Sequence, residues 1–289
     1  MTLDDIKQFL RDTLARLPIE RFRNPPPVVG VLRLEGVIGR SAGPGRQGLT
    51  LSGYEKAIAK LFDNKRLKAV ALEINSPGGS PVQSALIAKR IRDLADEKEL
   101  PVIAFCEDVA ASGGYWLACA ADEIYADANS IVGSIGVISA GFGFADLIER
   151  FGIERRVYST GPRKGMLDPF QDEKPEDVDR LRELHDDIFR NFKDHIRQRR
   201  GDRLLATDDA LFTGDIWTGR EAVEVGLIDG LAEMRSEMRK RHGDGVKFLR
   251  TEIRRGLLSR FRGGARSVLD PAGLISALDE WALWKRFGL

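Results

Sequence analysis

Short apolar segments alternate with helical segments through the first half of the chain, and this alternation restricts the possible folds more than any other sequence feature. Residues 28–38, 69–74 and 102–105 have the composition of buried strands, and helical patterns cover 54–63 and 82–95 between them. Strands separated by helices pair in parallel, because a parallel connection needs a crossover that a helix supplies. The sequence therefore predicts an α/β fold with a largely parallel sheet covered by helices.

The pattern continues with further buried segments. Residues 111–121 are uncharged and rich in small residues, which is typical of a fully buried helix, and strands are expected at 123–126 and 131–139. A short helical unit is expected at 217–231. From Pro175, apolar residues at helical spacing predict a long helix with charged flanks. These residues are Val178, Leu181, Leu184, Ile188, Phe192 and Ile196.

The sequence predicts that both termini are extensions of the globular body. Apolar residues recur at helical spacing before residue 18, so the chain is expected to open with an amphipathic helix. The prolines at 25–27 cannot continue that helix. We therefore expect an arm and proline linker over 1–27, a main domain over 28–232, and a C-terminal strand with a basic, amphipathic helical extension over 233–289.

Composition and charge narrow the classes of partner. The chain has 289 residues and a formal net charge of +1, so there is no electrostatic reason to expect nucleic acid as a partner. Charges interrupt the first 22 residues, and no apolar run is long enough to span a bilayer, so we expect a cytoplasmic or peripherally membrane-associated protein. Cys106 and Cys119 lie in apolar segments and are expected as reduced, buried thiols, although a disulfide stays open.

Ser112 is the first candidate for chemistry. It lies in the sequence Ala-Ala-Ser-Gly-Gly, at the expected junction of a strand and a buried helix. Such a junction exposes a nucleophile beside the free N–H groups of a helix start, where developing negative charge is favoured. Gly113 lets a substrate carbonyl approach the backbone. The alternative is that the small residues only allow close helix packing, and the local motif alone favours that alternative.

A glycine pair follows the preceding strand. Gly78 and Gly79 belong to the turn Asn-Ser-Pro-Gly-Gly. The carboxyl ends of parallel strands form the ligand-binding edge of such a sheet, so this turn and Ser112 are expected to face one crevice. The N–H groups of Gly79 and Gly113 could then bind one oxyanion. The alternative is a plain turn, for which the composition is equally suitable.

A serine nucleophile needs a base. The chain has three histidines, His185, His195 and His242, and none lies between Ser112 and Lys164. A Ser-His-Asp arrangement stays open, although nothing local supports it. A lysine is the other candidate, because burial disfavours the charged form of an amine and leaves it able to accept a proton.

Four linked motifs resemble one known family. The segments 75–79, 111–115, 131–137 and 161–165 occur in the order, and nearly at the spacing, of the signal peptide peptidase A (SppA) family of serine proteases. The resemblance covers about residues 28–230, and several linked motifs are far more specific than one. It implies the Clp protease/crotonase-like spiral core of parallel strands and helices, with helical terminal extensions, and a bacterial origin.

The resemblance also implies roles for individual residues. Ser112 matches the family nucleophile, Lys164 the general base, and Ser134 the serine that orients this base. Gly79 and Gly113 match the oxyanion turns. A solvated loop lysine is the alternative for Lys164, but its position 52 residues after Ser112 within the family motif favours the base. For Ser134 the alternative is a strand hydroxyl bonded to the backbone.

The implied function is a serine endopeptidase that hydrolyses peptides through an acyl-enzyme, with its Ser/Lys dyad in the domain 28–232. Signal-peptide remnants and small membrane-associated polypeptides are candidate substrates. No metal or organic cofactor is expected, since the sequence has no clustered Cys/His ligand set. A crotonase-type acyl-CoA hydratase or isomerase shares the fold but normally uses glutamate bases. A non-catalytic oligomeric scaffold is the third alternative, and the intact Ser112, Ser134 and Lys164 argue against it.

Two expectations concern assembly and membranes. Double-length members of the family carry the lysine and the serine in different halves of one chain. This chain is single-length, so the resemblance implies a homo-oligomer, an octamer-like ring, in which Ser112 of one protomer meets Lys164 of its neighbour. The basic segment 253–266 is a candidate for peripheral contact with anionic lipid. Packing on a neighbouring subunit, or a solvated tail, is the favoured alternative for this segment.

Overall fold

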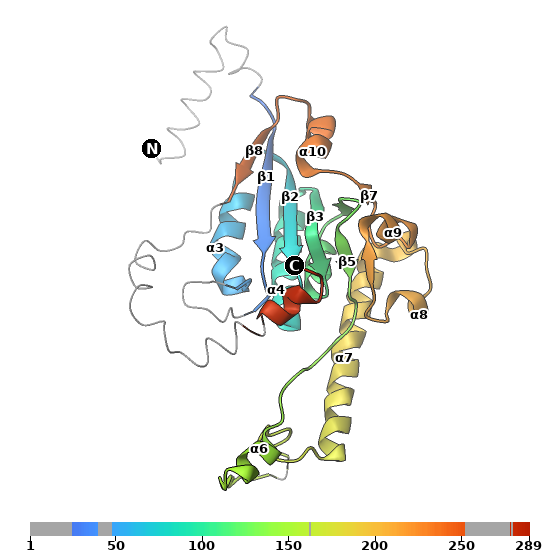
Figure 1. The fold of residues 1–289 in the computed structure, drawn as a ribbon. Coiled ribbons are helices and arrows are strands. Elements are labelled where there is room, and N and C mark those ends of the chain that lie inside the picture. The colour runs from blue at the N-terminus through green and yellow to red at the C-terminus, as the bar shows by residue number, and fades with distance from the viewer. Residues whose placement is uncertain (1–24, 40–47, 162, 252–277, 279) are drawn as a thin grey trace, which may run out of the picture.

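The computed structural model describes residues 25–39, 48–161, 163–251, 278 and 280–289 (Figure 1). The strands are β1 (Val28–Glu35), β2 (Leu67–Ser76), β3 (Val102–Ala111), β4 (Glu123–Ala126), β5 (Ile131–Gly133), β6 (Ile216–Thr218), β7 (Gly230–Leu231) and β8 (Lys247–Arg250). The helices are α3 (Leu51–Phe62), α4 (Pro81–Lys98), α5 (Gly113–Ala118), α6 (Ala145–Arg150), α7 (Pro175–Arg200), α8 (Asp208–Leu211), α9 (Gly219–Glu224) and α10 (Met234–His242), with a 3-10 turn at Gly201–Arg203. The expected N-terminal helix and the basic segment 253–266 lie outside the described residues.

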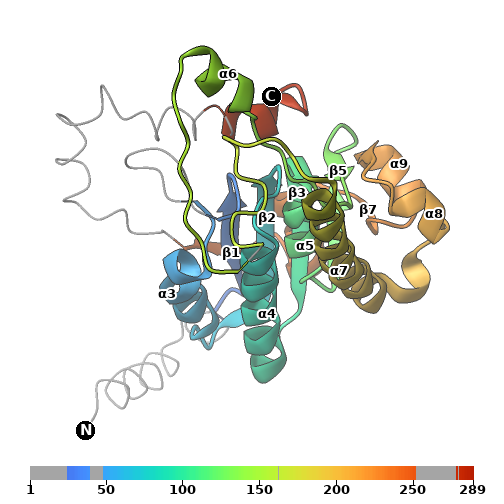
Figure 2. The ribbon, with the colours of Figure 1, turned by 90° about the horizontal axis from the view of Figure 1, so that it is seen from below.

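The described strands form one sheet in the order β6-β5-β3-β2-β1-β8, with β4 paired to β3 and β7. All the pairs are parallel except β5–β6, so the predicted α/β fold with a largely parallel sheet is confirmed. Successive residues of a strand point to opposite faces of a sheet. Leu32 and Leu34 of β1 accordingly join the larger core, which α3, α4, α5 and α7 cover (Figure 2). Val29 and Val31 join the smaller core, which α10 covers with Met234 and Met238.

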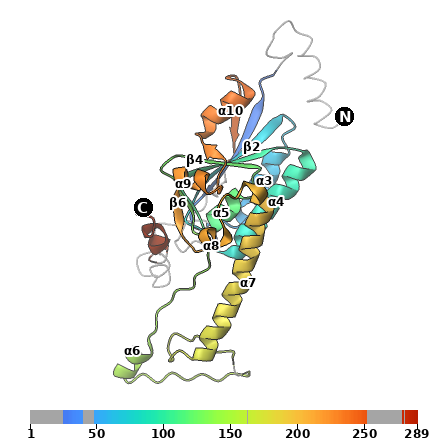
Figure 3. The same ribbon diagram turned by 90° about the vertical axis from the view of Figure 1, so that its right-hand side faces the viewer.

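One long segment leaves this body. After β5 the chain runs away from the sheet to α6, and it returns along α7 (Figures 1 and 3). We call residues 138–161 and 163–174 the arm. Its helix α6 has no buried residue, and in α7 all the buried residues beyond the first turn lie in the C-terminal half. The N-terminal half of α7 therefore projects from the core together with the arm.

Three predicted elements differ from the structure. The strand expected over 131–139 ends at Gly133, because Gly133 and Ser134 both have a positive φ, +105° and +50°, which is incompatible with an extended strand. The buried helix expected from residue 111 begins at Gly113, since β3 continues through Ala111. The unit expected at 217–231 contains the short strands β6 and β7 on either side of α9.

Cys106 and Cys119 are free and buried, as predicted. Burial raises the pKa of each thiol to about 12, so both stay protonated and unreactive at neutral pH. Within the part of the chain that the structure describes, no helix combines the length and the apolar character needed to cross a membrane.

An aromatic stack fastens α7 to α5. The ring of Trp116 lies 4.9 Å from the rings of both Phe192 and His195, and Nε2 of His195 is 3.2 Å from the Trp116 carbonyl oxygen. Burial of the imidazole lowers the pKa of His195 to about 4. In the unfolded chain an ordinary histidine titrates near 6.5, so between these two values the unfolded state binds more protons than the folded state.

The stability contribution of His195 should therefore be complete above about pH 6.5 and should fall as the pH falls through 4, by about 3 kcal/mol in total. Urea unfolding of the wild type and of His195→Gln at pH 7 and pH 4.5 measures this term as the difference between their pH effects. An equal loss of stability in wild type and His195→Gln would contradict the assignment.

Candidate active site

Ser112 occupies a strained turn between β3 and α5. Its backbone has φ +51° and ψ −119°, a region that residues with a side chain rarely adopt. The Ser112 N–H donates a 2.7 Å hydrogen bond to the Gly133 carbonyl, and the Ser112 carbonyl accepts a 3.0 Å bond from the Trp116 N–H. Bonds on both sides hold the turn in this conformation. Backbone strain of this kind clusters at active sites, where it aims a reactive side chain.

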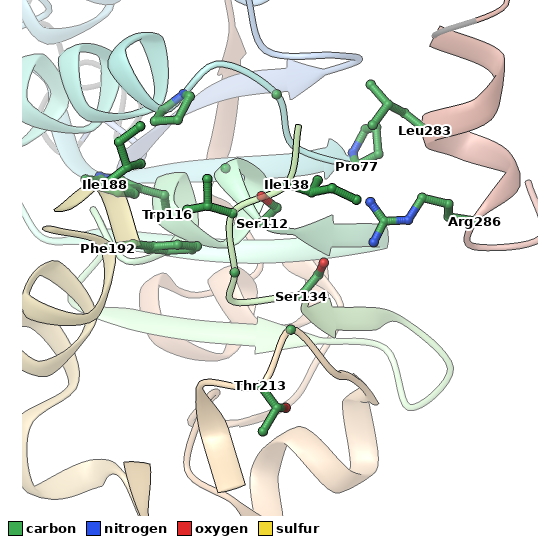
Figure 4. A pocket seen from close by; sticks show the side chains of 16 residues that line it. Pro77, Ser112, Trp116, Ser134, Ile138, Ile188, Phe192, Thr213, Leu283 and Arg286 are labelled. Carbon is green, nitrogen blue, oxygen red and sulfur yellow. The ribbon is translucent and has the colours of Figure 1, made fainter. Parts of the chain in front are cut away.

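A pocket of about 370 Å³ opens in front of this turn (Figure 4). Ser112, Ser134, Gly79 and Gly113, four of the five residues predicted for the site, line it together. The sheet brings these residues to one edge, because they follow the adjacent strands β2, β3 and β5 at their carboxyl ends.

The glycine turn after β2 lies against the serine turn. A Cβ atom on Gly78 would lie 2.8 Å from the Ser112 Cβ, and a Cβ on Gly79 would lie 2.1 Å from the Ile38 carbonyl oxygen. The turn is held there by two 2.8 Å bonds, from the Ile38 N–H to the Gly78 carbonyl and from the Ser80 N–H to the Ile38 carbonyl. Only glycine allows this approach. The backbone of the glycine turn therefore packs directly against the Ser112 turn.

Gly113 supplies the second backbone group. As the first residue of α5, it has no intrahelical acceptor for its N–H. A Cβ atom at this position would lie 2.5 Å from the Ser84 Oγ, so a larger residue would require the Ser84 side chain to move. Gly113 and Gly79 both line the pocket, so both backbones can face a substrate oxygen.

Ser134 reaches the pocket from β5, the strand next to the one that leads to Ser112. It directly follows β5 with φ +50°, and its N–H donates a 2.7 Å bond to the Asp215 carbonyl. The residue is only 7% exposed, and its hydroxyl points into the pocket (Figure 4). Ser112 and Ser134 therefore share one cavity without being close in sequence.

The rest of the pocket wall is mainly apolar. Trp116, Ile138, Ile188 and Phe192 line it, with the Trp116–Phe192 stack forming a rigid surface. An apolar cavity with a few polar groups at one end is typical of a site that binds an apolar group and orients it for reaction.

The proposed base is not in this pocket. Lys164 lies in an exposed turn of the arm, and it is absent from the pocket lining. The arm leads away from the sheet edge that carries Ser112 (Figure 3). Within one chain, the described structure does not bring Lys164 and Ser112 together.

None of the three histidines supplies the pocket with a base in place of Lys164. His195 lies behind Trp116, His185 is bonded to the Ser139 hydroxyl at 2.7 Å, and His242 ends α10 on the other face of the sheet. Among the described lining residues, Arg286 carries the single ionisable side chain, and a guanidinium cannot accept a proton. The described part of one chain thus gives the pocket serine hydroxyls but no carboxylate, imidazole or amine that could act as a base.

Sequence reasoning missed the contribution of the C-terminal end. Leu283 and Arg286 line the pocket. The Arg286 guanidinium points towards Ser112 and Ser134 (Figure 4). No sequence motif includes these residues. The sequence predicted a helical extension in this region but did not indicate which part of the protein it contacts. In the described residues, no group of three or more His, Cys, Asp or Glu side chains is arranged to hold a metal ion.

Comparison with known proteins identifies the family. The model of peptidase family S49 matches residues 95–243, which is just over half of the chain. The chain belongs to peptidase family S49. The predicted relationship to SppA-type serine proteases is thereby confirmed.

Two relatives illustrate the range of the family. The chain is 47% identical over 287 residues to "Na(+)/H(+) antiporter NhaA" of Brucella abortus (strain 2308), covering 96% of this chain and 39% of that protein. The antiporter name therefore describes a protein much longer than the shared region. The chain is also 33% identical over 172 residues to "Putative signal peptide peptidase SppA" of Enterococcus faecium, covering 60% of this chain and 49% of that protein. The chain thus spans less than half the length of either relative.

A solved structure confirms the predicted Clp protease/crotonase-like fold. It is that of a mutant of the "1510-N membrane-bound stomatin-specific protease" in complex with a substrate peptide, and it superposes with a TM-score of 0.50 at 14% identity. The match covers 83% of this chain and 98% of that chain. At this identity the likeness concerns the fold.

The strain at Ser112 has a measurable consequence. Ser112→Gly should be more stable than Ser112→Ala by about 1 kcal/mol, because only glycine adopts this φ/ψ without cost. Both variants lose the hydroxyl, so urea unfolding of the pair isolates the backbone term. The same pair at Ser84, inside α4, should give the opposite order, since glycine destabilises a helix interior relative to alanine. A Ser112→Gly protein less stable than Ser112→Ala would show that the turn is not strained.

Proposed function

We propose that the chain is a serine endopeptidase in which Ser112 is the nucleophile and Lys164 of a second copy is the general base. The observation that carries this proposal is the pocket itself. It combines a strained, outward-aimed serine, a second buried serine and two glycine turns, while the described residues of the chain supply it with no proton acceptor. A base from another copy would complete it.

The reaction follows the standard steps of acyl transfer. Neutral Lys164 accepts the Ser112 proton while the Oγ attacks the peptide carbonyl carbon. The N–H groups of Gly79 and Gly113 stabilise the oxyanion that forms. Collapse of the tetrahedral intermediate releases the amine, which takes the proton from Lys164. Water then attacks the ester with Lys164 again as base, and this step frees the acid and restores the Ser112 hydroxyl.

Ser134 has the orienting role in this proposal. Its hydroxyl points into the cavity that Ser112 also lines, where it can accept a hydrogen bond from the incoming amine. Losing this bond leaves the base in place but less well aligned, so Ser134→Ala should be impaired less than Ser112→Ala.

The preferred substrates are peptides that bind in extended form with small or apolar residues next to the cleaved bond. The apolar wall of Trp116, Ile188 and Phe192 supports this preference. Signal-peptide remnants and small membrane-associated polypeptides fit the same description. The name of the Enterococcus faecium relative agrees with it.

The two alternative functions are less well supported. Crotonase-type chemistry normally needs a glutamate base, and no glutamate is present among the described lining residues. A non-catalytic scaffold would have no reason to keep a strained serine, two close glycine turns and Ser134 at one cavity. A fluorophosphonate adduct on Ser112 would argue against both.

The arm is the part proposed to reach the second copy. It carries Lys164 and an unusual number of exposed apolar side chains, which are typical of an interaction surface. They include Ile138, Phe142, Leu147, Phe151, Ile153 and Tyr158. Contacts between different surfaces of successive copies can close into a ring, and we propose a homo-oligomeric ring of eight, as in the family that the sequence resembles.

Subunit mixing tests the shared site. Ser112→Ala and Lys164→Ala proteins should each be nearly inactive, and so should Lys164→Arg, because arginine keeps its proton. When equal amounts of the two alanine variants exchange subunits, about a quarter of the sites should pair an intact serine with an intact lysine, and peptide hydrolysis should return accordingly.

The control replaces the Lys164→Ala partner with a Ser112→Ala/Lys164→Ala double variant, which provides no intact serine and should restore nothing. Exchange itself is followed by native mass spectrometry of isotopically labelled copies. If exchange is complete and the first mixture stays inactive, the serine and its base belong to one chain.

A further inference from the structure

We propose that Arg155 and Asp168 are positioning residues that hold the turn carrying Lys164 in its reactive shape. This inference rests on the proposed role of Lys164 as the base. The arm has no hydrophobic core of its own, since α6 buries no residue. Some other interaction must therefore define the conformation of its tip.

Asp168 is the centre of that interaction. Its Oδ2 accepts bonds from Nη2 and Nε of Arg155 at 2.9 and 3.3 Å, and its Oδ1 accepts a 3.0 Å bond from the Phe170 N–H. Both carboxylate oxygens are therefore used, and the side chain is only 10% exposed. The hydrogen bond from the Phe170 N–H, and then that from Arg155, lowers the pKa of Asp168. We call the Arg155–Asp168 pair the clasp.

Aromatic contacts extend the clasp across the arm. The Arg155 guanidinium lies 5.3 Å from the centre of the Phe170 ring, and this ring stacks on Phe144 at 5.6 Å. The Phe144 N–H donates a 2.6 Å bond to the Pro169 carbonyl. The outgoing segment at 144, the middle segment at 155 and the returning segment at 168–170 are thereby tied together.

The Lys164 turn depends on this tie. The Asp168 N–H bonds to the Gly165 carbonyl at 3.3 Å, and the Met166 N–H bonds to the Arg163 carbonyl at 3.2 Å. Between them, Leu167 has φ +57°, a left-handed conformation that a leucine keeps only where its surroundings enforce it. The clasp fixes the residue directly after Leu167, so it fixes the end of the turn that presents Lys164.

Precise presentation matters because the Lys164 amine has to reach the serine from the end of a long arm. A general base has to lie within hydrogen-bond reach of its proton, and a displacement of about 1 Å can reduce the rate on the order of 100-fold. Lys164 must meet this requirement from the tip of an extended arm. A neighbouring ion pair offers a comparison: the side chains of Arg156 and Glu154 are two-thirds exposed, and among the described residues they bond to each other and not to the Lys164 turn.

The test compares kcat and KM of the assembled protein. Arg155→Met and Asp168→Asn should each lower kcat about 10-fold or more and leave KM within about twofold of wild type, because the pocket that binds substrate is unchanged. Arg155→Lys should recover part of the loss, since it can still donate one bond to Asp168. Arg156→Met, the matched control, should have the wild-type kcat. Native mass spectrometry should find the same assembly for all variants.

Subunit mixing adds a result that general destabilisation would not produce. Asp168→Asn mixed with Ser112→Ala should gain activity, because the Ser112→Ala copy supplies an undisturbed Lys164 turn to an intact serine. An Asp168→Asn/Ser112→Ala double variant mixed with Lys164→Ala should stay low, since the lysine it supplies is on the disturbed turn.

The possible failures are distinguishable. If Lys164→Ala is inactive while Arg155→Met and Asp168→Asn keep the wild-type kcat, the clasp is not a positioning device and the proposed base stands. If the clasp variants instead raise KM or dissociate the assembly, their role is structural and the inference is overturned. If Lys164→Ala keeps its activity, the proposed function itself fails.

Discussion

The hydrogen bond from the Ser112 N–H to the Gly133 carbonyl is the contact on which the candidate site depends. It continues the parallel pairing of β3 and β5 by one residue beyond Ala111, where the backbone turns into α5. The same pairing places Ser134, the residue after Gly133, beside Ser112 at the end of the neighbouring strand, and both residues line the pocket. One backbone interaction thus holds Ser112 in its strained conformation and sets its position relative to Ser134.

The sheet edge can position a nucleophile and an oxyanion site, but it leaves the site without a base. The described residues that line the pocket from β2, β3, β5 and the segments that follow them are prolines, glycines, serines and apolar residues. None of these side chains can act as a general base. The one predicted base lies on an arm whose apolar side chains face solvent in the single chain. Packing of the arm on a second copy would account for both the missing base and the exposed apolar side chains. The apolar surface of the arm would be buried, and the pocket would gain the Lys164 amine.

The sequence predicted what depends on local pattern. Alternating strands and helices indicated the parallel sheet, and the glycines after β2 and at Gly113 indicated close backbone approach. It could not predict that β5 stops at Gly133, since a positive φ at Ser134 depends on the Asp215 carbonyl far along the chain. Leu283 and Arg286 were missed because nothing in their local sequence relates them to a pocket built from much earlier parts of the chain. The role of Lys164 came from the family motif, and the single-chain structure leaves it as a prediction.

The most direct measurement of the central claim is labelling with a fluorophosphonate followed by peptide mapping. The wild-type protein should carry one adduct on the peptide that contains Ser112, and Ser112→Ala should carry none. Lys164→Arg should label far more slowly, because the serine then lacks a proton acceptor. An adduct on a different serine, or labelling of Ser112→Ala at the wild-type rate, would contradict the assignment of Ser112 as the nucleophile.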